Sequence, residues 1–249
     1  MGQFFSTVTS PFGFMHERIF EGGALNIVLI CLAFLVTILT AYLLGSINFA
    51  IIISKVKYKE DIRTFGSKNA GMTNMMRTYG KSAAAFTITG DILKAVIACI
   101  IGYLLIGQLG AFSAGLFCMV GHVFPIYYGF KGGKGVVTAF TTACMTDPPA
   151  FLIIFALFIV MVLIWRYISL GSITCFGLYP LVLAFTSRIA HAINPELPEV
   201  SPFIIFAVLM SALIIAKHWT NIQRLRNGTE SKFTFKKSVK PPKNTDGSK

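Results

Sequence analysis

The sequence predicts an all-α protein of the polytopic membrane type, a bundle of about seven transmembrane helices. Of its 249 residues, 55% are hydrophobic and 13% are charged, whereas a soluble domain has about a quarter of its residues charged to cover its surface. The hydrophobic residues also come in long runs, which are typical of segments that cross hydrocarbon. The net charge of +12 fits basic cytoplasmic loops better than a nucleic-acid partner.

Crossing the hydrocarbon takes about 20 apolar residues, or fewer where neighbouring protein covers the helix ends. The clear candidates are residues 25–54, 82–107, 150–165, 170–185 and 203–216, and two shorter ones are residues 110–127 and 136–145. Gly107 and Gly110 predict a short turn between the second and third spans. Pro148 and Pro149 predict a tight loop before the fifth span, because two prolines cannot continue a helix.

The basic residues predict the orientation of the chain. They are concentrated in residues 55–81, around residues 131–134, at Arg166 and after Lys217. An odd number of spans with this bias places the N-terminus outside and the C-terminus in the cytoplasm. We expect three parts: an N-terminal extension (1–24), a single transmembrane domain (25–230), and a Lys- and Pro-rich tail (231–249) that is disordered.

Cysteine and histidine give no sign of a metal or a cofactor. The five cysteines lie in apolar stretches without a CxxC pair, which is typical of small buried hydrophobic residues. The four histidines are scattered, so the pattern does not indicate a zinc centre.

Residues 61–80, DIRTFGSKNAGMTNMMRTYG, form a polar, glycine-rich and basic stretch after the first span. Glycines let backbone N–H groups approach an anion closely, and hydroxyl and amide side chains add hydrogen bonds. The guanidinium of Arg77 can grip a phosphate with two hydrogen bonds. The stretch therefore predicts a phosphate site, with a flexible basic loop as the alternative. The candidate phosphate ligands are Ser67, Asn69, Thr73, Asn74 and Arg77.

A second stretch, GFKGGKG at residues 129–135, leads into the short fourth span. A glycine-rich turn before a helix presents free N–H groups and the positive end of the helix dipole to an anion. Gly132, Gly133 and Lys134 are therefore predicted to bind phosphate, with a basic glycine hinge as the alternative. Gly135 stands where a Walker A loop needs Ser or Thr, so nucleotide hydrolysis is not indicated.

A third stretch, HWTNIQRLRNGTE at residues 218–230, is expected to continue the last span as a helix. At helical spacing His218, Asn221 and Arg224 share one face. A lone histidine at a helix end is usually structural, but one in register with Asn and Arg predicts a third part of the site, facing the cytoplasmic mouth of the bundle.

Two ionisable residues, Asp91 and Lys94, lie within the second span. A charge in mid-membrane costs about 2.5–3.5 kcal/mol on insertion scales, so we expect the pair to face the protein interior. A structural or supporting role is favoured over substrate contact. His122 and Ser46 are expected to be helix-packing residues.

In order along the chain, GSIN, DIRTFGSKNAGMTNMMRTYG, GDILKA, GHVFP…FKGGKGVVT, RYISLGSI and HWTNIQRLRNGTE resemble the signatures of the bacterial acyl-phosphate-dependent glycerol-3-phosphate acyltransferases. The resemblance covers residues 42–230 and implies a seven-span enzyme of the cell membrane with its active site facing the cytoplasm. Such an enzyme moves a fatty acyl group from acyl phosphate to the 1-position hydroxyl of glycerol 3-phosphate. The products are lysophosphatidate, the first intermediate of phospholipid synthesis, and inorganic phosphate.

Residue by residue, the resemblance implies a set of active-site positions. The catalytic candidates are Ser67, Lys134, His218 and Asn221, with Arg77 beside them and Ser169 or Ser172 as a weaker candidate. Arg77 and Lys134 would hold the two phosphates, while Ser67 and Asn221 would orient the donor. No Asp or Glu is obviously placed as a general base, so the proton acceptor is His218 or a substrate phosphate.

The sequence departs from the family pattern at several positions. GSKN replaces the usual GSGN, which puts Lys68 beside Ser67, and GMTN and GSIN replace GATN and GSIP. HWTN replaces HREN, which removes a charged pair near His218. These changes bear on fine geometry and donor preference.

Two other functional classes fit the composition less well. A transporter of a small phosphorylated solute is the main alternative, but it would place charges near the bilayer midplane and often shows repeated halves. A nucleic-acid binder would interleave aromatic and basic residues. The resemblance implies acyl phosphate, glycerol 3-phosphate and the lipid bilayer as partners. No nucleic acid and no cofactor are expected, and the oligomeric state is not predicted.

Overall fold

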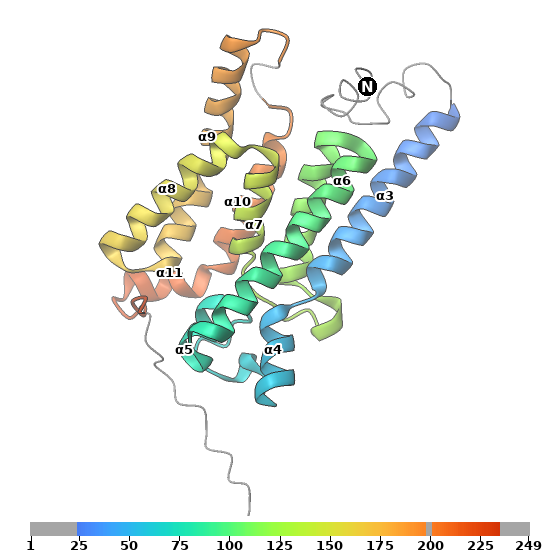
Figure 1. Ribbon diagram of the computed structural model, residues 1–249. Coiled ribbons are helices and arrows are strands. Elements are labelled where there is room, and N and C mark those ends of the chain that lie inside the picture. Colours follow the sequence, from blue (N-terminus) through green and yellow to red (C-terminus); the bar gives the residue numbers. More distant parts are fainter. Residues whose placement is uncertain (1–23, 198–200, 235–249) are drawn as a thin grey trace, which may run out of the picture.

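Helices make up the regular structure of the computed structural model, in which residues 24–197 and 201–234 are described. The all-α prediction is confirmed for that part of the chain, where no strand occurs (Figure 1). The predicted N-terminal extension and all but the first residues of the predicted tail lie outside the described residues. The helices are α3 (Ala24–Ser46), α4 (Phe49–Tyr58), α5 (Met72–Tyr79), α6 (Lys81–Val123), α7 (Val136–Thr146), α8 (Pro148–Trp165), α9 (Ile168–Ile193), α10 (Ile204–Lys217) and α11 (Trp219–Arg226), with 3-10 turns η1 (Ile62–Thr64) and η2 (Ile126–Tyr128).

The long helix α6 is a hairpin of two limbs (Figure 1). The chain leaves helical geometry at Ile106 (φ −138°) and Gly107 (φ 63°), and glycine takes a positive φ without steric cost. The limbs approach so closely that a Cβ on Gly110 would lie 1.9 Å from the carbonyl oxygen of Gly102. The predicted turn near Gly107 is thus confirmed.

Four helical stretches are long and apolar enough to cross a membrane: Ile27–Tyr58, Lys81–Tyr128, Pro148–Trp165 and Ile168–Ile193. The bent pair α10 and α11 passes the same test together and gives up to five, while α7 is a shorter apolar helix. Large apolar side chains such as Leu104, Leu163 and Leu181 are exposed, as a lipid-facing surface requires. The count of seven spans and the placement of the termini stay predictions.

The first predicted span, residues 25–54, coincides largely with the apolar stretch Ile27–Tyr58, but it is not one continuous helix. Helix α3 ends at Ser46 and α4 begins at Phe49. The cause is Asn48, whose side-chain oxygen accepts a hydrogen bond from the N–H of Ile51 at 3.1 Å and so starts a new helix. An asparagine within an apolar run was therefore a helix cap.

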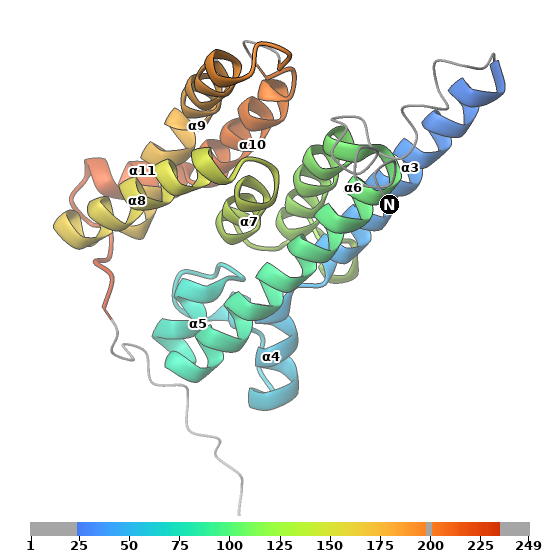
Figure 2. The ribbon, with the colours of Figure 1, turned by 45° about the horizontal axis from the view of Figure 1, so that its top comes forward.

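Helix α7 lies between two groups of helices (Figure 2). One group is formed by α3, α4, α5 and α6, and the other by α8, α9, α10 and α11. Phe140 in α7 packs against Phe158 and Phe176, with ring centroids 5.2 Å and 4.8 Å away. Because protein covers α7 on several sides, its 11 residues form a largely buried helix. The position of α7 between the two groups also fixes where the preceding glycine-rich loop lies.

Helices α3 and α6 pack through glycines on both sides. A Cβ on Gly45 would lie 2.0 Å from the carbonyl oxygen of Cys118, and one on Gly121 would lie 2.2 Å from that of Tyr42. Small residues of this kind allow the close backbone approach that stabilises helix pairs in membranes.

We predict that Gly45→Ala lowers the thermal midpoint of the protein in detergent, because overpacking costs about 1–3 kcal/mol. The matched control is Gly177→Ala in α9, where an added Cβ meets no atom within 4 Å. That variant should keep or raise the midpoint, since alanine favours a helix over glycine. Equal midpoints for the two variants would contradict the packing described.

Candidate active site

Residues 61–80 fold into η1, a loop and α5, and Asn74 organises them from inside. Its side-chain oxygen accepts from the N–H of Ser67 at 3.1 Å, and its amide donates to the carbonyls of Ile62, Phe65 and Asn69 at 3.2, 3.0 and 3.1 Å. Asn74 is also fully buried. The structure therefore uses this predicted phosphate ligand to shape the loop, because its polar atoms already have partners there.

The neighbouring Ser67 and Lys68 are exposed on the surface of the loop, while Asn69 and Thr73 are half-buried. Lys68 has φ 58°, a left-handed conformation that costs about 1–2 kcal/mol for a residue with a Cβ. The departure from the family's GSGN pattern therefore adds backbone strain as well as a charge beside Ser67.

Arg63 ties this loop to the second stretch. Its guanidinium donates to the carbonyls of Tyr128 and Lys131 at 2.7 and 3.1 Å. The carboxylate of Asp61 holds the guanidinium at 2.7 Å, and this hydrogen bond lowers the pKa of Asp61. The two predicted phosphate stretches are thereby fixed side by side.

The glycine-rich loop at residues 129–135 doubles back along the end of α6. The N–H groups of Gly132 and Gly133 donate to the carbonyls of Val123 and His122 at 3.2 and 3.1 Å. The prediction that these two amides are free to bind phosphate is wrong, because they satisfy carbonyls that the end of a helix leaves unpaired. Gly135 (φ 78°) then turns the chain into α7.

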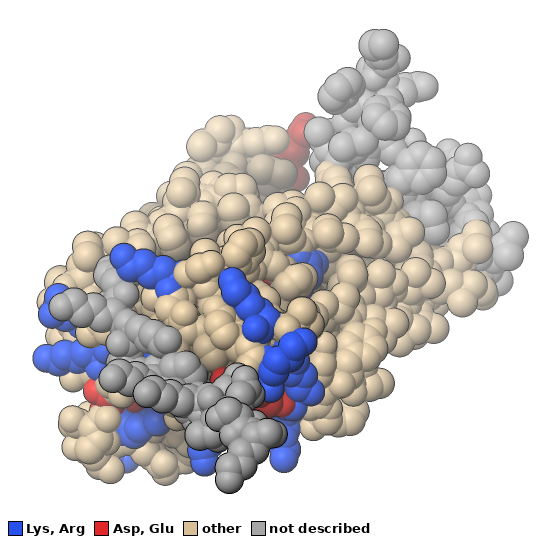
Figure 3. Space-filling view, turned by 60° about the horizontal axis from the view of Figure 1, so that its bottom comes forward, with Lys and Arg blue, Asp and Glu red and all other residues tan. Residues whose placement is uncertain are grey.

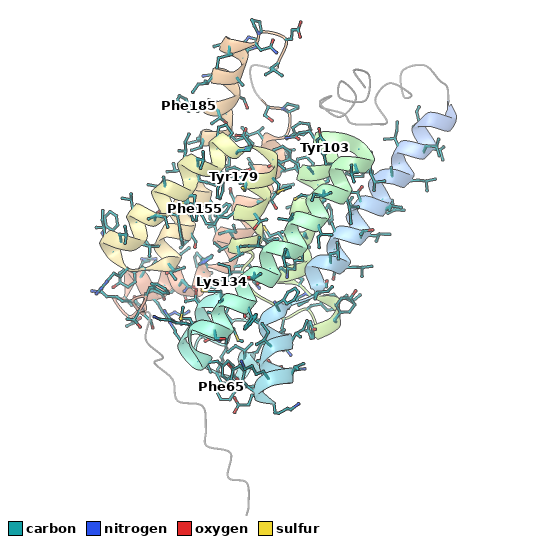
Figure 4. All side chains as sticks on the ribbon, viewed as in Figure 1. Phe65, Tyr103, Lys134, Phe155, Tyr179 and Phe185 are labelled. Atoms are coloured by element: carbon teal, nitrogen blue, oxygen red, sulfur yellow. The ribbon has the colours of Figure 1, made fainter. Side chains whose placement is uncertain are left out.

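Lys134 leaves this loop toward the C-terminal stretch, near the end of the bundle that carries α5 and α11 (Figure 4). Its ammonium donates to the side-chain oxygen of Asn221, 87 residues further along the chain. The structure therefore brings the second and third predicted stretches together through their central residues.

The third stretch does not continue α10 as a straight helix, which corrects the prediction. The chain bends by 57° at His218, where the His218 N–H is shared between the carbonyls of Ile214 and Ile215. The ring Nδ1–H donates to the carbonyl of Ile214 at 2.8 Å. Because a carbonyl only accepts, Nδ1 carries the proton and Nε2 is left as the acceptor.

Glu230 is the acidic residue that sequence reasoning missed. Its Oε1 accepts from the side-chain amide of Asn221 and the hydroxyl of Ser169, both at 2.7 Å. Its Oε2 lies 3.3 Å from Nε of Arg224. The weaker candidate Ser169 thus contacts the same carboxylate as Asn221, whereas the Ser172 hydroxyl donates within α9 to Ile168. The only signal in the sequence was one acidic residue ending a basic stretch.

The segment after Glu230 also contacts the site. Arg77 in α5 donates to the carbonyl of Ser231 at 3.1 Å, and the N–H of Phe233 donates to the carbonyl of Arg166. These residues, expected to begin a solvated tail, are held against α5 and the start of α9.

The family model for glycerol-3-phosphate acyltransferase matches residues 35–228, which contain all the predicted site positions. The chain belongs to this family. Glycerol-3-phosphate acyltransferases of Finegoldia magna and Trichlorobacter lovleyi are 37% and 42% identical to it over 195 residues, which is 78% of this chain and 93% and 94% of theirs.

Solved structures agree with this assignment. A crystal structure of PlsY, an integral membrane glycerol 3-phosphate acyltransferase in its glycerol 3-phosphate form, is 35% identical, covers 81% of this chain and 96% of its own, and gives a TM-score of 0.71. Its lysophosphatidic acid form is 34% identical with a TM-score of 0.68. The resemblance found in the motifs is confirmed, and the chain is an integral membrane protein of this family.

The charges of this glycerol-3-phosphate acyltransferase favour an anion. Burial lowers the pKa of Lys134 to about 8; Glu230 acts in the opposite direction, and Arg224 and Arg77 lower it further. Burial also lowers the pKa of Arg77. Three cationic side chains thus share one carboxylate, and the surplus positive charge can be neutralised by a phosphate.

We predict that Glu230→Gln lowers the pKa of Lys134 below about 8, because the carboxylate is the group that favours the charged ammonium. The measurement is the pH dependence of Lys134 labelling by an amine-reactive reagent, followed by mass spectrometry. The half-labelling pH should fall in the variant. Glu60→Gln is the control, since Glu60 accepts from the hydroxyl of Tyr79 instead, and a shift of the same size there would argue against the assignment.

Proposed function

We propose that the protein transfers a fatty acyl group from acyl phosphate to the 1-position hydroxyl of glycerol 3-phosphate. Family membership supports glycerol 3-phosphate as the acceptor. The observation that carries the proposal is the contact between Lys134 and Asn221, which joins two stretches predicted to bind phosphate in a region of surplus positive charge. Both proposed substrates carry a phosphate, so a site with several cations suits them.

The reaction needs positioning more than a strong nucleophile. The 1-hydroxyl oxygen attacks the carbonyl carbon of acyl phosphate, and the bond from that carbon to the phosphate oxygen breaks. Phosphate leaves with the electron pair, and the hydroxyl proton passes to an acceptor. In this proposal Arg77 and Lys134 hold the two phosphates and stabilise the developing negative charge, while Ser67 and Asn221 orient the donor.

We propose two candidates for the proton acceptor. One is Nε2 of His218, which the hydrogen bond from Nδ1 to Ile214 leaves as an acceptor. The other is a phosphate oxygen of a substrate. Glu230 suits the role less well, because both of its oxygens already face donors or an arginine. We assign Glu230 to holding Asn221 and Arg224 in place.

We further propose that residues 25–230 form one transmembrane domain of seven spans, with the active site facing the cytoplasm. Lys and Arg side chains gather over the end of the molecule that carries α4, α5 and α11 (Figure 3). The positive-inside bias assigns such an end to the cytoplasm. Glycerol 3-phosphate and acyl phosphate would then reach the site from that side.

The decisive experiment supplies the purified protein, in detergent or vesicles, with glycerol 3-phosphate and either acyl phosphate or acyl-CoA. We expect lysophosphatidate and inorganic phosphate with acyl phosphate. Lys134→Ala should lower kcat/KM by about 10²–10³-fold, the usual effect of losing a group that stabilises developing charge. Lys57→Ala, which removes an exposed lysine of α4, should change it little.

Full activity in Lys134→Ala would overturn the phosphate-binding role of Lys134. Product with acyl-CoA alone would overturn the proposed donor. Activity with neither donor, together with flux of a phosphorylated solute into vesicles, would favour a transporter.

We predict that kcat/KM for glycerol 3-phosphate falls as the pH rises through about 8. Burial lowers the pKa of Lys134 to about 8, so its side chain is charged below that pH and neutral above it. The ratio kcat/KM reports the titration of groups in the free enzyme. The substrate phosphate, with a second pKa near 6, stays doubly charged throughout. Lys134→Arg keeps its charge, so its profile should stay flat to about pH 10. Profiles that fall together would assign the titration to another group.

A further inference from the structure

Lys94 lies in the first limb of α6, 4% exposed, and its ammonium has more partners than Asp91 alone. The nitrogen is 2.9 Å from Oδ1 of Asp91 and 2.9 Å from Nδ1 of His122 in the second limb. It also donates to the carbonyls of Gly45 and Ile47 at 3.0 and 2.9 Å. One buried charge therefore joins α3 to both limbs of α6.

Gly45 lies in the last turn of α3, and Ile47 follows its last residue, in the break before α4. The last carbonyls of a helix have no partner within it, and a cation there also complements the negative end of the dipole. Just beyond the break, the side-chain amide of Asn48 donates to the carbonyl of Ala70 at 3.3 Å. Lys94 thus fixes the segment on which the loop around Ser67 rests.

His122 connects the same ammonium to the other phosphate-binding stretch. Because an ammonium only donates, Nδ1 of His122 accepts and the ring is neutral. The His122 carbonyl accepts from the N–H of Gly133 at 3.1 Å. A Cβ on Gly133 would lie 2.1 Å from Nε2 of His122 and 2.7 Å from the carbonyl oxygen of Ala70. Gly133 is therefore enclosed between the His122 ring and the first loop, directly before Lys134.

We propose that Asp91, Lys94 and His122 are positioning residues, which set the distance between the loop around Ser67 and the loop that carries Lys134. The proposal rests on the function proposed above. Asp91 neutralises the ammonium of Lys94, which orients the His122 ring and the end of α3. The segment after α3 then holds Ala70 through Asn48, and His122 holds Gly133. In this proposal none of the three touches a substrate, and each acts through the backbone of the two loops.

The thermal midpoint and the activity of two variants distinguish a purely structural ion pair from a positioning cluster. Lys94→Met leaves the Asp91 carboxylate buried without its cation, so both views expect loss of stability. The double variant Asp91→Asn, Lys94→Met removes both charges, and replacing a whole buried pair with uncharged residues is often tolerated. If the pair only stabilises the bundle, the double variant recovers the wild-type thermal midpoint and the wild-type activity together.

If the cluster positions the two loops, we expect the double variant to recover its thermal midpoint but not its activity. In the double variant the thermal midpoint should recover toward wild type, while the donors to Gly45 and Ile47 are still missing. The backbone N–H groups of Gly132 and Gly133 should then exchange with deuterium about tenfold faster or more. The KM for glycerol 3-phosphate should rise about ten- to a hundredfold, as a small misplacement of a binding group does.

The control is Asp147→Asn at the far end of α7. Asp147 accepts from the N–H of Ala150 at 2.8 Å and from the hydroxyl of Thr186, so its loss tests general destabilisation away from the site. In Asp147→Asn, deuterium exchange at Gly132 and Gly133 and the KM for glycerol 3-phosphate should stay at wild-type values. A double variant with wild-type exchange and KM would overturn the proposal. The exchange measurement needs no substrate, so it holds even if the proposed donor is wrong.

Discussion

The rest of the candidate site depends on the hydrogen bonds and the ion pair of the Glu230 carboxylate. Lys134, Arg77 and Arg224 would repel one another in a partly buried region that screens charge poorly. Glu230 pairs directly with Arg224 and reaches Lys134 through Asn221. Arg77 is held next to Glu230 by the carbonyl of Ser231, so one negative charge lies among three positive ones and does not neutralise them. The proposed site is therefore organised without a substrate and keeps a surplus positive charge that suits a doubly charged phosphate.

The short helix α7 turns this arrangement of charges into a fixed geometry. Its aromatic contacts with α8 and α9 hold its depth in the bundle, and the preceding loop is bonded to the end of α6. Lys134 is thus held from both sides, and only its side chain is left to reach Asn221. A glycine-rich loop whose amides had no hydrogen-bond partners would have more conformational freedom. The hydrogen bonds of Gly132 and Gly133 thus fix the backbone directly before Lys134.

Hydropathy and composition could predict the helical class, the turn at Gly107 and the three polar stretches, because each depends on residues that are neighbours in sequence. They could not predict that Gly132 and Gly133 are bonded to α6, since that depends on a loop folding back. Asn48 did carry a cap signal, but its apolar surroundings concealed it. Glu230 carried almost none, because a single acidic residue beyond a helix has no periodicity to reveal it.

The bend at His218 explains why the site needs the chain beyond the last helix. Because α11 turns by 57° from α10, Asn221 can meet Lys134 while the chain continues to Glu230 and back to α9. There Ser169 and Arg166 bind Glu230 and Phe233. A straight helix would carry Glu230 away from its partners, and Arg77 would lose the carbonyl of Ser231. The departure from a regular helix is therefore what closes the cationic site.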